Sequence, residues 1–211
     1  MRRHTAREVL ADRQIHRIGL SAAGLAAAWL VAVAATSGSA VVGISLLIYA
    51  TGLLGMLGCS AAYSLATDSP RRELLRRLDH AAIFLMIAGT YTPFTMIRLN
   101  GAWSVAMTTC IWAVASAGIA MKLCRPRRLE RTSILVYLSL GWAGLIALRP
   151  LVTAVDHTTL VLLGIGGMLY TLGVVFHLWR SLPFHTATWH GFVLSAASCH
   201  YVAVLHGAVA G

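Results

Sequence analysis

Charge is the first thing that this sequence lacks. Only 11% of its 211 residues are charged, and only seven of them are acidic. A soluble domain of this size normally carries about one charged residue in four. The charges that are present stand between long uncharged runs, and 58% of the chain is hydrophobic. This composition excludes an ordinary soluble domain and predicts a polytopic membrane protein.

The sequence also lacks paired cysteines, linkers and internal repeats. None of its four cysteines forms a CxxC pair, and three of them lie inside hydrophobic runs, so we expect free, buried thiols and no disulfide. The hydrophobic runs follow one another through short connections. No room is left between them for a soluble domain.

Seven hydrophobic runs are long enough to cross a membrane. A bilayer core of about 30 Å needs about 20 apolar residues in a helix. The first run follows an Arg-rich segment but is longer than a signal-peptide core, so we expect it to be retained. We therefore predict an all-α protein with a cytoplasmic segment 1–17 and a seven-helix transmembrane domain 18–211. Its predicted spans are 18–37, 41–66, 79–98, 102–122, 133–149, 158–179 and 187–209.

The basic residues indicate the orientation of these spans. Of 17 Lys and Arg residues, five lie in the N-terminal segment, four follow the second span, five follow the fourth and one follows the sixth. Only Arg98 and Arg149 lie on the other side. Basic loops prefer the cytoplasm, so we expect a plasma-membrane protein with its N-terminus inside and its C-terminus outside. The net charge of +10 is thereby explained without nucleic acid, and membrane lipids are the expected partners.

Asp79 is the only acid that adjoins a hydrophobic run. Two interpretations stay open for it. It caps the start of the third span and offsets Arg76 and Arg77, or it faces a cavity in the bundle as a general base beside a metal. The predicted topology brings several other polar side chains to the same cytoplasmic depth: Ser60, Ser64, His80, His177, His185 and His190.

Residues 79–94, DHAAIFLMIAGTYTPF, resemble the third-span signature of the hemolysin III proteins, bacterial members of the seven-helix progestin and adiponectin receptor family. The resemblance continues in order along the chain. Glu8, Asp12, His16 and Gly19 match a pattern of Glu, Asn, His and Gly, with Asp12 in place of Asn. Further matches are SLGWAG at 139–144, GGMLYTLGVVF at 166–176 and WHGFVLSAASCHY at 189–201.

The resemblance implies a zinc ion near the cytoplasmic face. In the family pattern it is held by the histidine of an S-x-x-x-H motif on span two and by both histidines of an H-x-x-x-H motif on span seven. An Asp of span three and the motif Ser support the water that zinc activates. Three nitrogen ligands and an open position are typical of catalytic zinc.

This chain departs from the pattern at two of the three ligands. Ser60 matches the motif serine, but Ser64 stands where histidine is expected. His185 and His190 are five residues apart, with Thr186 in the ligand register, and five residues on a helix separate two side chains by about 140°. Asp79 and His190 keep their register. His80 and His177 are the candidates to complete the coordination of zinc.

Three functions fit these observations. The first is an enzyme in which zinc, Asp79 and Ser60 hydrolyse an amide or ester of a ceramide-like lipid. The second is a membrane-perturbing or pore-forming hemolysin, which causes cytolysis. It ranks lower because no span carries the repeated polar positions of a wide aqueous pore. The third is a receptor-like or structural membrane protein whose metal site has decayed.

The predicted orientation is tested with reporter fusions. A reporter placed after residue 125 and one placed at Gly211 should report opposite sides of the membrane, because three predicted spans, an odd number, lie between these two positions. Alkaline phosphatase and green fluorescent protein, which are active on opposite sides, provide the measurement. Two fusions that report the same side would contradict seven spans.

Overall fold

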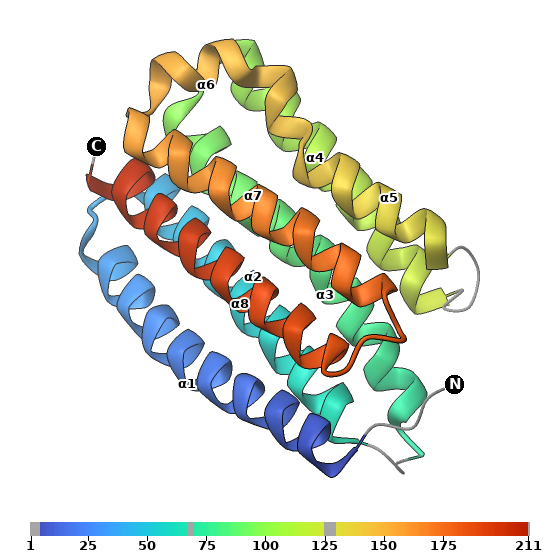
Figure 1. Cartoon of the computed structure of the whole chain (residues 1–211). Coiled ribbons are helices and arrows are strands. Elements are labelled where there is room, and N and C mark those ends of the chain that lie inside the picture. The colour runs from blue at the N-terminus through green and yellow to red at the C-terminus, as the bar shows by residue number, and fades with distance from the viewer. Residues whose placement is uncertain (1–4, 67–69, 125–129, 211) are drawn as a thin grey trace.

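The computed structural model describes residues 5–66, 70–124 and 130–210, and every regular element within these ranges is a helix (Figure 1). The α-helices are α1 (Ala6–Thr36), α2 (Ala40–Leu65), α3 (Arg72–Pro93), α4 (Gly101–Cys124), α5 (Glu130–Gly141), α6 (Leu148–Ala154), α7 (His157–Leu178) and α8 (His185–Val204). Three shorter segments join or extend them: the π-helical η1 (Phe94–Arg98), the 3₁₀-helical η2 (Ala143–Ala147) and the π-helical η3 (Leu205–Ala210).

The helices form one bundle in which chain neighbours are mostly neighbours in space. Helices α1 to α4 pack against one another in order, and α7 packs along α8. Helix α8 then returns against α1, whereas α5 makes lighter contact with α3, α4 and α7 (Figure 1). The first and last helices are therefore side by side. Residues almost a whole chain length apart can meet between them.

The prediction of an all-helical membrane bundle is confirmed. Six helical stretches are long and apolar enough to cross a membrane: Ala6–Thr36, Ala40–Leu65, Arg72–Arg98, Gly101–Cys124, Thr132–Ala154 and His157–Leu178. They correspond to the first six predicted spans. Helix α8, which corresponds to the seventh predicted span, is not among these apolar stretches of the described residues, and it carries His185, His190 and His200.

Helix α1 begins at Ala6, well before the predicted start of the first span at residue 18. The reason is a capping box. The Thr5 hydroxyl accepts a hydrogen bond from the Glu8 amide at 3.3 Å, and the Glu8 carboxylate accepts one from the Thr5 amide at 2.7 Å. These bonds satisfy amides that a helix start otherwise leaves unpaired. Residues 6–17 are thus continuous with the first span.

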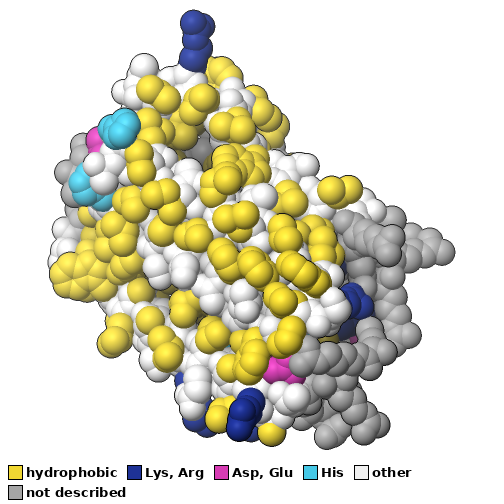
Figure 2. Space-filling view, viewed as in Figure 1, with side chains coloured by type: hydrophobic (Ala, Val, Ile, Leu, Met, Phe, Trp, Pro, Cys, Tyr) yellow, Lys and Arg dark blue, Asp and Glu magenta, His cyan; other side chains and the backbone are white. Residues whose placement is uncertain are grey.

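The outside of the bundle is hydrophobic, as lipid contact requires. Leu25 is 77% exposed and Ile146 is 72% exposed, and such side chains spread across the face shown in Figure 2. Basic side chains appear at the two ends of that face. The four cysteines are free, as predicted, but none is buried as expected: Cys110 and Cys124 are exposed, and Cys59 and Cys199 are half-buried.

A small polar cluster closes the end of the bundle where α7 begins. Asp156 accepts hydrogen bonds from the amide and the hydroxyl of Thr159, at 3.1 and 2.6 Å. These bonds lower the pKa of Asp156 to about 2. His206 of η3 joins them at 3.2 Å from the Asp156 carboxylate. This cluster lies at the start of α7 and beyond the end of α8, far from the residues at the start of α8.

Glycines allow close approach inside the bundle. A Cβ added at Gly118 of α4 would lie 2.4 Å from the ring of Phe84, which is fully buried in α3 and packs against Tyr137. A Cβ at Gly24 of α1 would meet nothing within 4 Å. The two glycines differ in the free space around them, although both lie inside long helices.

We expect Gly118→Ala to lower the free energy of unfolding by about 1–3 kcal/mol, because the added methyl group would overlap the buried ring of Phe84. Gly24→Ala is the matched control, and it should stabilise by about 0.5–1 kcal/mol through the loss of chain entropy in the unfolded state. Thermal unfolding in detergent measures both. Equal melting temperatures for the two variants would contradict the packing of α3 on α4.

Candidate metal centre

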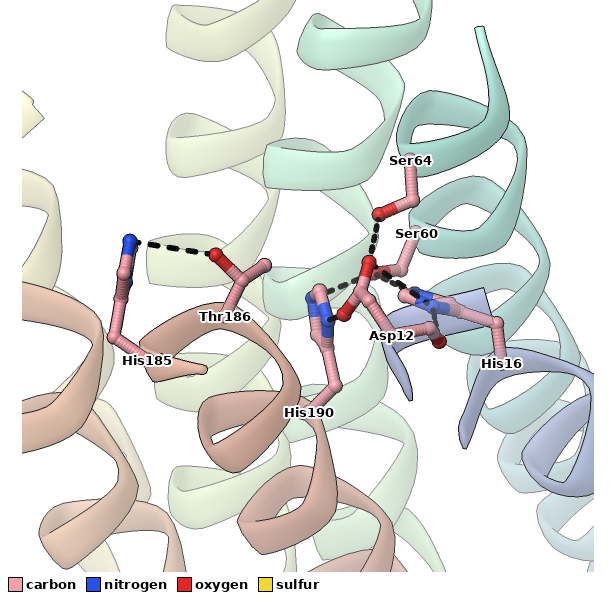
Figure 3. A network of polar contacts seen from close by, with 7 residues as sticks. All are labelled: Asp12, His16, Ser60, Ser64, His185, Thr186 and His190. Carbon is pink, nitrogen blue, oxygen red and sulfur yellow. Dashed lines mark hydrogen bonds and ion pairs between the residues drawn. The ribbon is translucent and has the colours of Figure 1, made fainter. Parts of the chain in front are cut away.

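Side chains from α1, α2 and α8 meet at the end of the bundle where α8 begins (Figure 3). The Asp12 carboxylate is the centre of this cluster. One of its oxygens lies 2.6 Å from His190 Nδ1, and the other accepts a hydrogen bond from the Ser64 hydroxyl at 2.8 Å. Ser60 lies between the two imidazoles, 3.3 Å from His16 Nε2 and 3.4 Å from His190 Nε2.

The fold of α1 fixes the direction of His16. Its Nδ1 donates a hydrogen bond to the Asp12 backbone carbonyl at 2.9 Å, one turn earlier in the same helix. A ring nitrogen engaged in this way leaves Nε2 to accept a hydrogen bond or bind a metal. The rings of His16 and His190 meet edge to face, with centroids 4.3 Å apart.

Helix periodicity places these α1 side chains on one face. Glu8, Asp12 and His16 are spaced four residues apart and all three are buried. Glu8 also accepts a hydrogen bond at 2.9 Å from the amide of Phe184, which precedes α8 with a left-handed φ of 59°. The face of α1 that holds Asp12 therefore also anchors the turn that starts α8. That turn brings His190 to the cluster.

The cluster has the composition of an open metal site. One ligand atom from each of Asp12, His16 and His190 lies within 4.8 Å of the other two. Two imidazoles and one carboxylate bind catalytic zinc in several enzyme families and leave a position open for water or substrate. The same set also suits Fe(II). These residues therefore fit a divalent metal ion.

Asp79 lies next to this cluster and does not cap a helix. Helix α3 begins at Arg72, so Asp79 is well inside it, and Arg76 and Arg77 pair with Glu73 instead. The Asp79 carboxylate lies beside the Ser60 hydroxyl and within electrostatic reach of His190. Of the two interpretations of Asp79, the structure supports the cavity-facing carboxylate.

Of the other predicted metal positions, Ser64 touches the cluster, whereas His80, His177 and His185 are not among the described residues whose ligand atoms come together there. His185 points away from it, and its Nε2 lies 3.5 Å from the Thr186 hydroxyl (Figure 3). This direction agrees with the five-residue spacing to His190. Ser64 holds Asp12 through a hydrogen bond. His177 lies against Trp189, with ring centroids 5.1 Å apart, and the His80 carbonyl accepts a hydrogen bond from Tyr137.

A cavity of about 880 Å³ opens beside the cluster. His16, Ser60, Asp79 and His190 line it, together with His80, His177 and His185. Apolar side chains that include Met56, Leu57, Ile83, Met86 and Val193 form much of the remaining wall. The volume lies in the range of about 300–1,000 Å³ that is usual for small-molecule sites.

Sequence reasoning missed Asp12 and His16 as candidate ligands. It treated residues 1–17 as a segment before the first span, although the four-residue spacing of Glu8, Asp12 and His16 is typical of one helix face. It also treated the changes at 12 and 64 separately. In the structure these two departures from the pattern touch each other at 2.8 Å.

Fold and site together define a polytopic helical membrane protein with a histidine and carboxylate cluster at one end of its bundle. Residues 8–201 match the family model described as "Haemolysin-III related", and the chain belongs to this family.

Three relatives illustrate the relationship. The hemolysin-3 homolog of Bacillus subtilis (strain 168) is 34% identical over 95% of this chain and 94% of its own. Hemolysin-3 of Bacillus cereus is 41% identical over 63% of this chain and 61% of its own. The human monocyte to macrophage differentiation factor is 30% identical over 74% of this chain and 67% of its own. No solved structure matches the chain.

The paired change at 12 and 64 gives a test of the ligand set. Asp12→Asn should lower the metal content of the purified protein at least about tenfold, because an amide binds zinc far more weakly than a carboxylate. Adding Ser64→His to Asp12→Asn restores both residues of the family pattern. It should recover the metal through a third imidazole. Mass spectrometry of metals measures all three proteins.

His206→Ala is the control, since His206 lies at the other end of α8. It should keep the native metal content. If Asp12→Asn holds as much metal as the native protein, Asp12 is no ligand. If the double variant holds no metal, a histidine at position 64 does not replace Asp12 as a ligand.

Proposed function

We propose that this protein is a zinc-dependent hydrolase that cleaves an amide or ester bond of a membrane lipid. The observation that carries the proposal is the placement of the Asp79 carboxylate beside the cluster of Asp12, His16 and His190, in a largely apolar cavity. A carboxylate next to a metal site inside a membrane bundle is costly without a function. Hydrolysis of a lipid would use the cluster to hold the metal, the carboxylate as the base and the apolar cavity for the acyl chain.

The residues divide into ligands and acid–base groups. Asp12, His16 and His190 would hold the zinc, and zinc supplies Lewis-acid polarisation of the scissile carbonyl and makes water a stronger nucleophile. Asp79 accepts the proton of the attacking water and then gives it to the leaving nitrogen or oxygen. The Ser60 hydroxyl lies between Asp79 and the two imidazoles and orients the carboxylate.

The cavity supports a lipid substrate more than a soluble one. Met56, Leu57, Ile83 and Met86 continue the wall from the cluster toward the middle of the bundle. Such a wall buries an acyl chain favourably, by about 25 cal/mol for each Å² of apolar surface removed from water. The ceramide-like substrate expected from the family resemblance fits this arrangement.

Cytolysis is the second candidate, and one relative supports it by name. The Bacillus cereus protein is called hemolysin-3. Membrane damage requires no wide pore if lipid products accumulate, so the two candidates are not exclusive.

We also propose that the protein lies in the plasma membrane with a cytoplasmic N-terminus, because of the distribution of its basic residues.

Asp79→Asn tests the proposed chemistry. The substitution keeps the shape of the side chain but removes its basicity, so hydrolysis should fall about 10²–10⁴-fold while the metal content is unchanged. Release of a fluorescent fatty acid from a labelled ceramide in detergent micelles measures the rate. Asp156→Asn, at the opposite end of the bundle, is the matched control and should hydrolyse at the native rate.

Native, zinc-loaded protein that releases no fatty acid from amide or ester lipids would overturn the hydrolase. So would an Asp79→Asn variant that is as active as the native protein. Loss of metal in Asp79→Asn would instead make Asp79 a ligand and not a base.

A further inference from the structure

One end of the cavity is lined by cations. Arg76 of α3, Lys122 of α4 and Arg180, which follows α7, all contribute to its wall. The imidazoles of His80, His177 and His185 line the cavity as well. Among the described residues that line it, Asp79 is the one acid. Three cations and one acid of the described lining residues thus lie toward the end of the cavity that holds the metal cluster.

The positive-inside rule explains why Arg76, Lys122 and Arg180 lie at one end of the bundle, but not why Lys122, in the last turn of α4, is only 1% exposed. A buried charge inside a membrane bundle usually marks a binding site or an ion pair. Glu73 offsets part of this charge, because it pairs with Arg76 at 3.0 Å and with Arg77 at 3.4 Å. Glu73 itself is not part of the cavity wall.

Three helices present the same order of side chains along the cavity. On α3 the order is Arg76, Asp79 and then Ile83 and Met86. On α8 it is His185, His190 and then Val193 and Leu194.

On α7, read from its C-terminal end, Arg180 just beyond the helix and His177 precede Val174. A basic level, a reactive level and an apolar level thus follow one another along the cavity.

We propose that the substrate is an acyl lipid with an anionic headgroup, best matched by a phosphate. This inference rests on the proposed function and names the substrate class of the same site. The phosphate binds Arg180 through the paired hydrogen bonds that guanidinium groups form, and Lys122 and Arg76, which also pairs with Glu73, add positive charge beside it. The scissile amide or ester then lies at the level of Asp79 and His190, and the acyl chain occupies the apolar level.

Binding measurements test the headgroup without hydrolysis. The protein is Asp79→Asn in detergent micelles, and the probes are two single-chain lipids with the same fluorescent acyl chain. One is a lysophosphatidic acid and the other a monoacylglycerol. We expect the phosphate lipid to bind about tenfold or more tightly, which is the usual contribution of charge-assisted hydrogen bonds.

Arg180→Gln in the same background should reduce this preference to about twofold or less, because it removes one hydrogen-bonding cation from the basic level. Arg13→Gln is the matched control. Arg13 is exposed on α1 and lines no part of the cavity, so the preference should stay.

Four outcomes would overturn the inference. Equal binding of the two lipids would show that the cavity has no site for the phosphate headgroup. An equal loss of preference in Arg13→Gln and Arg180→Gln would indicate attraction by the whole surface. Glycerol phosphate that displaces the fluorescent lipid with the affinity of the lipid itself would assign the site to a soluble phosphate. Native protein that hydrolyses neutral and phosphate lipids at one rate would keep the hydrolase but refute this substrate class.

Discussion

The contact between Asp12 and His190 is the interaction on which the rest of the structure depends. At 2.6 Å it joins the first helix to the last and closes the bundle. Asp12 is 9% exposed, so it would be a buried, unpaired carboxylate without its partners. A buried polar group that loses its hydrogen-bond partner costs about 1–3 kcal/mol, and more when the group is charged. The residues that would hold a metal therefore also determine how α8 lies against α1.

Much of the architecture could be predicted because lipid allows few alternatives. Every backbone group must be paired inside the membrane, so long apolar runs become helices, and the first six predicted runs correspond in order to the six apolar helical stretches. Asp79, Ser60 and His190 were expected at one depth from topology alone. Asp12 and His16 were not, because hydropathy marks where an apolar run begins, whereas the Thr5–Glu8 capping box determines where α1 begins.

The exchange at positions 12 and 64 changes the charge of the site as well as its geometry. The family pattern has a neutral amide and an imidazole at these positions, whereas this chain has a carboxylate and a hydroxyl that touch at 2.8 Å. A carboxylate ligand binds a divalent cation more strongly by charge than an imidazole does, but it leaves the cation with less positive charge to polarise a carbonyl. The nearby basic side chains of the cavity partly restore that positive field.

The depth of the cluster also suits a reaction that needs both water and lipid. Water reaches the ends of a bundle, while an acyl chain is stable only among apolar walls. Asp79 lies between Arg76, near the end of the bundle, and Met86, which is buried in the core. A hydrolytic group closer to the middle of the membrane would lack access to water, and one in a loop would lie too far from the acyl chain of the lipid. The level of Asp79 on α3 is where the two requirements overlap.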